Sequence, residues 1–178
     1  PLLVESTEEI AVPTPQGVFG LRAWRFADGA EHISARALDR DGTPVPAEDG
    51  GVPAVRIHSE CATGDIFGSF RCDCGPQLEN GLRIIGHTGG YLIYVRNHEG
   101  RGIGLVNKLR AYALQDAGLD TLDANLALGL DGDMRDYSQA ALILQELGVN
   151  ELRLVTNNPA KQEAVSYTHL TLPTRELV

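Results

Sequence analysis

Apolar and polar positions alternate with a period of two from residue 17 to residue 38, on either side of the pair Asp28-Gly29. This alternation is typical of half-buried β-strands, and an Asp-Gly pair between two such runs favours a tight turn. The pattern therefore predicts an antiparallel β-hairpin near the N-terminus. Residues 39–53 are rich in Asp, Gly and Pro, which indicates a loop.

Further along the chain, strand patterns alternate with helix patterns. Short apolar runs predict strands at residues 54–58, 91–96 and 151–156. Helical spacing predicts helices from about Pro76 to Gly89, over residues 105–117 and over residues 137–147, each followed by glycine. This order predicts an α/β (α+β) fold, a mixed sheet in which the N-terminal antiparallel hairpin is joined to βα units.

The last thirteen residues depart from this alternation. Residues 166–178 show neither a helical face nor a strand pattern, and Pro173 interrupts them. We therefore expect one domain over residues 1–165, followed by a non-native or atypical tail over residues 166–178. The alternative is a native loop with a short strand.

Composition limits the classes of function. The chain has 178 residues, of which 43% are hydrophobic and 22% charged, as expected for one globular domain. It lacks an apolar run of the roughly 20 residues that cross a bilayer. Its formal net charge of −9 argues against binding to nucleic acid or to an anionic membrane, because both require a cationic face. We expect neither as a partner.

All three cysteines of the chain, Cys61, Cys72 and Cys74, lie within one short segment as C-x10-C-x-C. Three cysteines cannot all pair within one chain, and the sequence has no secretion signal, so we expect a reducing, cytoplasmic location. Three sulfur donors suit a zinc ion, and a fourth position open to water is the mark of a catalytic site. A fourth protein ligand such as His58 or His87 would make the site structural, and three unrelated buried cysteines are the remaining alternative.

A glycine-rich segment, Glu-Gly-Arg-Gly-Ile-Gly at residues 99–104, lies between a predicted strand and a predicted helix. Backbone amides at the start of a helix favour phosphate, and Arg101 adds a bidentate donor. The segment lacks the spacing of the dinucleotide fingerprint and the lysine-hydroxyl pair of the P-loop. A plain turn is the alternative.

Five segments taken together resemble a known family. They are Arg-Ile-His-Ser-Glu-Cys-Ala-Thr-Gly-Asp at residues 56–65, Arg-Cys-Asp-Cys-Gly at 71–75, Asn-His-Glu-Gly-Arg-Gly-Ile-Gly-Leu at 97–105, Asn-Lys-Leu-Arg-Ala-Tyr-Ala-Leu-Gln-Asp at 107–116 and Thr-Asn-Asn-Pro at 156–159. In this order and spacing the chain closely resembles GTP cyclohydrolase II, the enzyme that opens riboflavin biosynthesis. The resemblance runs from about residue 10 to about residue 165.

The resemblance implies an enzyme that converts GTP to formate, pyrophosphate and 2,5-diamino-6-ribosylamino-4(3H)-pyrimidinone 5′-phosphate. It implies one zinc ion per chain, Mg²⁺ with the GTP phosphates, and a cytoplasmic homodimer. The zinc ligands would be Cys61, Cys72 and Cys74. The residues expected to contact GTP are Arg56, Ile57, His58, Ser59, Glu60, Gln77, Glu99, Gly100, Arg101, Thr121, Thr156 and Lys161.

The resemblance also implies three catalytic residues, Asp133, Arg135 and Tyr112. The family pattern makes the arginine a nucleophile that accepts a phosphoryl group. Because a guanidinium stays protonated in proteins, the alternative is that Arg135 acts as a charge clamp. Tyr112 on its own could equally be a core residue, Asp133 and Arg135 a solvated loop pair, and Lys161 a surface residue.

Two other functions compete with the complete reaction. The first is a related enzyme that keeps the formyl group on the product. Tyr112 favours full deformylation, because a hydroxyl can move protons where an apolar side chain cannot. The second is a nucleotide-binding regulatory module with a structural zinc, which would bind GTP and release no formate.

Overall fold

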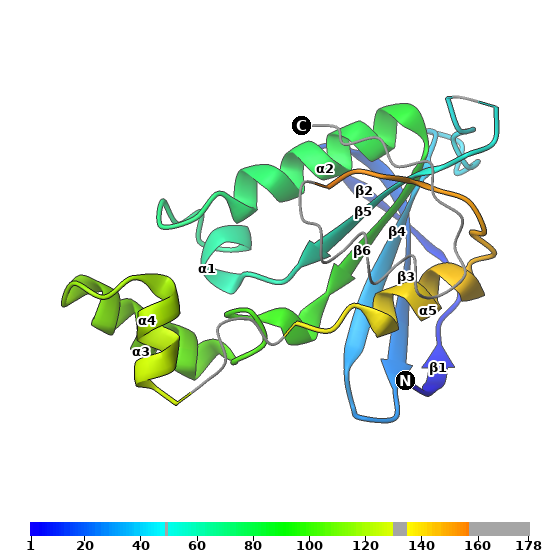
Figure 1. Cartoon of the computed structure of the whole chain (residues 1–178). Coiled ribbons are helices and arrows are strands. Elements are labelled where there is room, and N and C mark those ends of the chain that lie inside the picture. The colour runs from blue at the N-terminus through cyan, green and yellow to red at the C-terminus, as the bar shows by residue number, and fades with distance from the viewer. Residues whose placement is uncertain (49, 130–134, 157–178) are drawn as a thin grey trace.

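The computed structural model describes residues 1–48, 50–129 and 135–156 (Figure 1). Within these residues the centre of the molecule is a seven-stranded sheet in the order β1-β3-β4-β6-β5-β7, with β2 paired to β3. The strands are β1 Leu3–Ser6, β2 Ile10–Thr14, β3 Gly17–Phe26, β4 Glu31–Leu38, β5 Ala54–Ser59, β6 Gly90–Val95 and β7 Arg153–Leu154. The helices are α1 Ala62–Asp65, α2 Cys74–Thr88, the 3-10 turn η1 Arg96–His98, α3 Leu105–Asp116, α4 Thr121–Ala127 and α5 Ser138–Glu146.

The predicted N-terminal hairpin is confirmed as β3 and β4. The two strands pair antiparallel from Val18 opposite Leu38 to Arg25 opposite Glu31. In the turn, the backbone N–H of Ala30 donates to Asp28 Oδ1 at 2.9 Å. The Asp-Gly pair therefore forms the turn that the sequence predicts, and its aspartate holds the backbone of the turn.

The second half of the sheet is a parallel βα unit. β5 and β6 pair parallel along their whole length, α2 connects them, and β6 pairs antiparallel with β4. The sheet is therefore mixed, as predicted. Pro76 lies in the first turn of α2, where a missing backbone N–H removes no helical hydrogen bond. The helix ends before Gly89, whose φ is +75°.

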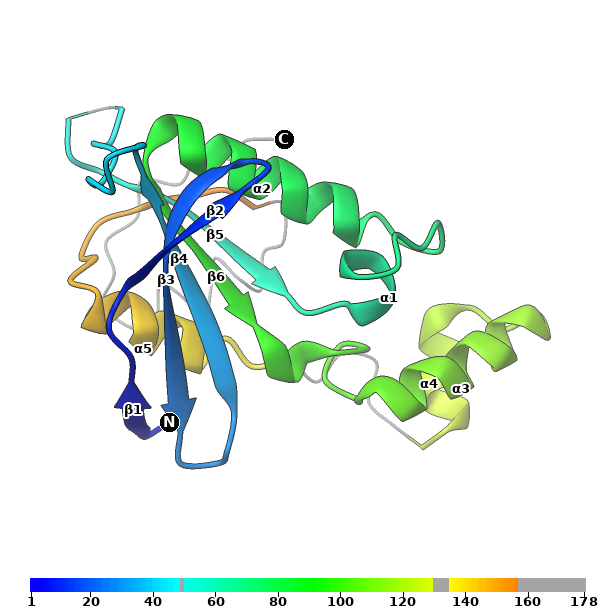
Figure 2. The same ribbon diagram turned by 180° about the vertical axis from the view of Figure 1, so that it is seen from behind.

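Helices cover both faces of the sheet. α5 packs on one face against Trp24, Ile57 and Ile93, and α2 packs on the other through Ile85. Figures 1 and 2 show the two helices on opposite sides of the strands. Because successive residues of β5 point to opposite faces, the strand contributes to both cores, and four of its six residues are buried.

α3 and α4 form a helical hairpin that stands away from the sheet, beyond the carboxyl ends of β5 and β6 (Figures 1 and 2). Asp120 caps α4, since its side chain accepts a hydrogen bond from the backbone N–H of Asp123 at 2.7 Å.

Several elements differ from the sequence-based expectation. β1, β2 and α4 were not predicted, because each is short and has largely exposed positions, which weakens its periodic signal. α1 was not predicted because its four residues are too few to show a helical period. The strand predicted at residues 151–156 has only two residues in the ladder, since it pairs with β5 alone. The predicted domain end at residue 165 and the tail at 166–178 lie outside the described residues. No helix within the described ranges is long and apolar enough to cross a membrane.

Candidate active site

The three cysteines converge from three successive pieces of chain. Cys61 follows β5 and precedes α1, Cys72 lies in the loop after α1, and Cys74 begins α2. Their Sγ atoms all lie within 4.8 Å of one another, with Cys61 and Cys72 at 3.6 Å. A tetrahedral zinc ion with Zn–S bonds of about 2.3 Å requires sulfur atoms about 3.8 Å apart. The donor set therefore fits zinc both in chemistry and in spacing.

Two glycines allow the cysteine-bearing segments to approach each other. A methyl group on Gly64 would lie 2.8 Å from Cys72 Sγ and 2.9 Å from Cys74 Cβ. A methyl group on Gly75 would lie 2.6 Å from the carbonyl oxygen of Gly64. These distances are shorter than van der Waals contact, so α1 and the start of α2 meet at this distance only because both residues lack a side chain.

We expect Gly64→Ala to empty the metal centre. The added methyl would push Cys72 and Cys74 away from Cys61, and overpacking of this kind costs about 1–3 kcal/mol of stability. Zinc content of the purified variant, measured by elemental analysis, should fall far below that of the wild type. Gly86→Ala is the control: its methyl would meet the carbonyl oxygen of Gln16 at 3.2 Å, in a part of α2 remote from the cysteines. Equal zinc content in Gly64→Ala and Gly86→Ala would contradict this account.

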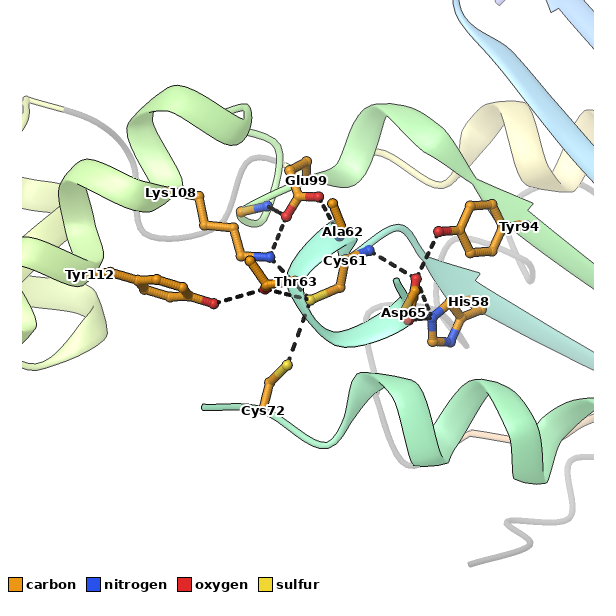
Figure 3. Close-up of polar contacts among 11 residues, drawn as sticks. His58, Cys61, Ala62, Thr63, Asp65, Cys72, Tyr94, Glu99, Lys108 and Tyr112 are labelled. Atoms are coloured by element: carbon orange, nitrogen blue, oxygen red, sulfur yellow. Dashed lines mark hydrogen bonds and ion pairs between the residues drawn. The ribbon is translucent and has the colours of Figure 1, made fainter. Parts of the chain in front are cut away.

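Cys61 is the most heavily contacted of the three cysteines (Figure 3). Lys108 Nζ donates to Cys61 Sγ at 3.0 Å, and the hydroxyl of Thr63 lies 3.6 Å from the same sulfur. Burial alone would raise the pKa of the Cys61 thiol, but the hydrogen bonds from Lys108 and Thr63 lower it overall. Burial, together with Cys61 and Cys72, raises the pKa of the Cys74 thiol. A bound metal ion would displace the protons that remain on these sulfurs.

His58 contacts Asp65 of α1 and is not part of the cysteine cluster. Its Nε2 lies 3.0 and 3.2 Å from the two carboxylate oxygens of Asp65. Asp65 also accepts hydrogen bonds from the Tyr94 hydroxyl at 2.7 Å and from the backbone N–H of Cys61 at 3.1 Å. Burial by itself would raise the pKa of Asp65, but the hydrogen bonds from His58 and Tyr94 lower it overall. Asp65 thus ties α1 to β5 and β6.

The alternative of a fourth histidine ligand finds no support in the described part of the chain. The cluster of potential metal ligands there contains the three cysteines and no histidine. His87 lies thirteen positions after Cys74 on α2, which corresponds to about 20 Å along a helix. A bound ion would therefore have three protein ligands among the described residues.

A cleft of about 300 Å³ opens beside the sulfur atoms, between β5, the glycine-rich segment and the α3–α4 hairpin. It brings together many of the residues that the sequence predicted for the site. Those that line it are Ser59, Glu60, Cys61, Cys72, Cys74, Gly100, Arg101, Tyr112, Thr121 and Arg135. Burial, together with the charge of Glu99, raises the pKa of Glu60.

Tyr112 forms one wall of this cleft. Its hydroxyl lies 3.2 Å from Thr63 Oγ1, and the guanidinium of Arg71 stacks over its ring at 4.2 Å from the centroid. Arg71 also pairs with Asp116 at 2.9 Å. The tyrosine is held by its neighbours with its hydroxyl directed toward Cys61 (Figure 3), which is not the arrangement of a core residue.

A second group of predicted residues lies apart from the cleft. Arg56 Nη1 donates to the carbonyl oxygen of Val155 at 3.1 Å, and Nη2 lies 3.4 Å from Gln77 Oε1. Thr156 follows Val155 and is buried. Burial lowers the pKa of Arg56, and its buried Nε has no hydrogen-bond partner in the described structure. Arg56 and Gln77 are thus partly buried polar neighbours between β5 and α2, close to the chain that follows β7.

The remaining predicted residues have other surroundings. The side chain of Ile57 is buried in the core on the α5 side. Glu99 is buried, and its carboxylate accepts hydrogen bonds from Ala62, Gly100 and Lys108. Asp133 and Lys161 lie outside the described residues. For all of these residues, contact with GTP or a part in catalysis stays a prediction.

Sequence reasoning missed several supporting residues, among them Thr63, Gly64 and Asp65. His98 is another. Its Nδ1 accepts a hydrogen bond from the Ser59 hydroxyl at 2.8 Å, and its Nε2–H donates to the carbonyl oxygen of Asp136 at 2.7 Å, next to Arg135. All four lie inside segments that carried the family resemblance, so a signal existed. The segments do not reveal which neighbour each side chain meets.

Comparison with known proteins supports the resemblance. The "Riboflavin biosynthesis protein RibBA" of Rhodococcus jostii is 53% identical over 161 residues, which is 89% of this chain and 38% of that protein. The proteins of the same name from Mycobacterium bovis and Mycolicibacterium paratuberculosis are each 52% identical over 160 residues, 89% of this chain and 37% of theirs. The chain thus spans less than two fifths of the length of these relatives.

A solved structure, that of RibBX, a two domain 3,4-dihydroxy-2-butanone 4-phosphate synthase from A. baumannii, is similar over 100% of this chain and 41% of that one. Its sequence identity of 18% and TM-score of 0.48 are too low to establish a relationship. The sequence profile described as GTP cyclohydrolase II matches residues 5–175, nearly the whole chain. The chain therefore belongs to the GTP cyclohydrolase II family.

Proposed function

We propose that this domain hydrolyses the imidazole ring of GTP and releases formate and pyrophosphate, the first step of riboflavin biosynthesis. The product would be 2,5-diamino-6-ribosylamino-4(3H)-pyrimidinone 5′-phosphate. The observation that carries the proposal is the convergence of three cysteine sulfurs on a cleft lined by Arg101, Tyr112 and Arg135, in a member of this family.

The chemistry requires the metal that the cysteines fit. C8 of guanine lies between two nitrogens of an aromatic ring and is a weak electrophile. Cys61, Cys72 and Cys74 would hold one zinc ion per chain, which supplies a Lewis acid and an activated water near neutral pH. Mg²⁺ would accompany the GTP phosphates.

Other side chains would bind the phosphates, transfer protons and hold the nucleotide. Arg101 and Arg135 carry permanent positive charge and would hold the phosphates for the separate displacement at the α-phosphorus. In this assignment Arg135 acts as a charge clamp, because a neutral guanidine nucleophile is expensive in a protein. Asp133 would be the catalytic acid–base, and Arg56, Gln77 and Thr156 would bind the nucleotide from β5, α2 and the chain after β7.

Tyr112 would move a proton close to the metal centre. As a metal ligand, Cys61 is a thiolate and accepts only, so the Thr63 hydroxyl at 3.6 Å donates to it. Thr63 must then accept from the Tyr112 hydroxyl at 3.2 Å. The Tyr112 hydroxyl can rotate toward the cleft and donate its proton to a ring nitrogen of the base as the ring bond breaks, and it would regain a proton from water.

Product analysis tests the proposed function. The purified protein, loaded with zinc, is incubated with GTP and Mg²⁺, and the products are identified by mass spectrometry. We expect formate, pyrophosphate and the diaminopyrimidinone phosphate, with strong preference for GTP over ATP, because adenine leaves guanine-specific acceptors unpaired. A formamide product would identify the related enzyme that keeps the formyl group. GTP binding with neither product would identify the regulatory module.

Arg101 allows a test of substrate binding that leaves the fold intact. It has a φ of +60°, the only positive φ among the described residues other than glycine. In Arg101→Gly, the removal of the side chain relieves about 1–2 kcal/mol of left-handed backbone strain in the folded state. This gain offsets the roughly 0.5–1 kcal/mol that glycine costs through the greater entropy of the unfolded chain. We therefore expect an unchanged or slightly higher melting temperature, together with GTP affinity about 10- to 100-fold weaker, as for the loss of a charged hydrogen bond.

Arg40→Gly is the control for this variant, since Arg40 is an exposed residue of the 39–53 loop and its loss changes the net charge equally. Isothermal titration calorimetry with GTP and a thermal melt measure both quantities. Equal GTP affinity in the two variants would remove Arg101 from the binding site.

We also propose a homodimer and a cytoplasmic location. The α3–α4 hairpin exposes apolar side chains that the rest of the described chain does not cover, namely Leu105, Val106, Leu109, Leu119, Leu122 and Leu126. A second copy would cover them. Three clustered cysteines without a disulfide suit a reducing compartment. A monomer by analytical ultracentrifugation would exclude the dimer.

A further inference from the structure

A buried lysine lies against the cysteine cluster. Lys108 is 7% exposed, and its Nζ donates a hydrogen bond to Cys61 Sγ at 3.0 Å. The lysine belongs to α3, whereas Cys61 follows β5, so the contact joins the helical hairpin to the sheet (Figure 3). Lysine is almost never buried to this extent unless its charge is paired, and its position therefore requires an explanation.

Glu99 fixes the position of this lysine. Its Oε1 pairs with Lys108 Nζ and accepts the backbone N–H of Gly100 at 3.2 Å. Its Oε2 accepts the backbone N–H of Ala62 at 2.7 Å, at the start of α1. Glu99 is itself 8% exposed. Lys108 is thus held between one carboxylate and one cysteine sulfur, and both partners are anchored to the backbone around the metal centre.

The negative charge of the metal centre explains why a cation lies next to it. Three thiolates and one divalent zinc ion carry a net charge of −1, close to the buried carboxylate of Glu99. A hydrogen bond from a charged donor is roughly twice as strong as a neutral one, and it is directional. An ammonium group at Cys61 therefore offsets negative charge and fixes the direction of the sulfur lone pairs.

We propose that Lys108 is a positioning residue of the metal centre: its ammonium group, held by Glu99, orients Cys61 and offsets the negative charge that three cysteines bring to a bound zinc ion. The inference rests on the proposed zinc centre and deepens it. Lys108 also lines the cleft. The competing role is direct contact with a substrate phosphate, which predicts changes in GTP affinity and none in zinc affinity.

The experiment compares four variants with the wild type. Lys108→Met removes the charge and the donor while keeping the length of the side chain. Because this change leaves Glu99 buried without its cation, the double variant Lys108→Met/Glu99→Gln removes both charges together and protects folding. Lys108→Arg is the conservative variant that restores a cationic donor. Arg110→Met is the matched control, an exposed residue of the same helix whose loss changes the net charge equally.

Two measurements report on the metal centre without any turnover of GTP. Competition with a chelator gives the zinc dissociation constant. In cobalt-substituted protein, the sulfur-to-cobalt charge-transfer band reports the energy of the sulfur lone pairs. Loss of a hydrogen bond to Cys61 raises that energy and moves the band to longer wavelength. A residue that only supports the fold would not move this band in a protein that remains folded.

We expect Lys108→Met and the double variant to bind zinc about 10- to 100-fold more weakly, as found for residues that support metal ligands. Both should shift the cobalt band to longer wavelength. Lys108→Arg should return it toward the wild-type position, and Arg110→Met should leave it unchanged.

A folded double variant with wild-type zinc affinity and an unshifted band would overturn the inference, even if the wild type releases formate. A wild type that binds neither zinc nor cobalt would overturn it together with the proposed centre, whereas a wild type that binds zinc but does not consume GTP would contradict the proposed reaction alone.

Discussion

Cys72→Ser is expected to abolish formate release from GTP while the protein remains folded. Cys72 supplies one of three sulfurs within 4.8 Å of one another, and serine is a poor ligand for zinc compared with thiolate. Loss of a residue that only supports a metal ligand already costs about 10- to 100-fold in metal affinity, so loss of the ligand itself should exceed about 100-fold. Elemental analysis and a formate assay measure the two effects.

The same variant separates the two halves of the reaction. Pyrophosphate leaves from the other end of the nucleotide, where the arginines of the cleft are expected to act. We therefore expect Cys72→Ser still to release pyrophosphate from GTP and to leave GMP. If the folded variant makes neither product, the two steps share one site, and if a folded, zinc-free variant still makes formate, the cysteines are not the catalytic centre.

Two checks are needed for this prediction. A three-thiolate zinc site can itself contribute to folding, so the variant must show a native circular dichroism spectrum and a cooperative melt. Phe70→Ser is the matched control, because it makes the same kind of polar replacement two positions earlier in the same loop. The Phe70 side chain is fully exposed, and we expect its loss to leave zinc content and formate release unchanged.

Tyr112→Phe is expected to slow formate release by roughly 10²- to 10⁴-fold, the range for loss of a general acid or base. Phenylalanine keeps the ring on which Arg71 stacks and removes only the hydroxyl that lies 3.2 Å from Thr63. GTP affinity should therefore change little, and the effect should fall on kcat and not on KM. Single-turnover formate release and calorimetric GTP binding separate these quantities.

Tyr91→Phe provides the control for the loss of a tyrosine hydroxyl, because Tyr91 on β6 lines a different cavity. Its formate release should equal that of the wild type. Wild-type formate production by Tyr112→Phe would mean that the tyrosine serves packing alone. A product that retains the formyl group would instead show that the hydroxyl is needed specifically for deformylation.

Much of the fold could be predicted from periodicity. The alternation around Asp28-Gly29 predicts the β3–β4 hairpin because each residue of a half-buried strand must match one face. The helical spacing over residues 105–117 predicts α3 to within one residue. β1 and β2 could not be predicted in this way, since they are short, lie toward the edge of the sheet and expose most of their side chains.

The sequence named candidate residues for the site and indicated few of the contacts between them. The spacing of the cysteines indicates a metal site, and Tyr112 and Arg101 do line the adjoining cleft. The same motifs grouped Arg56 and Gln77 with these residues; both are partly buried, do not line the described cleft and lie beside Val155, so their contact with GTP stays a prediction. A motif indicates which residues are required, but the path of the backbone determines which of their side chains line the same cleft.

The sequence by itself determined the mixed α/β architecture, the family and the grouping of the three cysteines, because local periodicity and residue chemistry can be read directly from the order of residues. Only the tertiary structure decided that Gly64 makes room for the cysteines, that His58 turns to Asp65, and that Lys108 reaches Cys61 across 47 positions of sequence. Such contacts depend on the path of the intervening chain and on close packing between elements. Neither of these produces a periodic pattern in the sequence around the residues concerned.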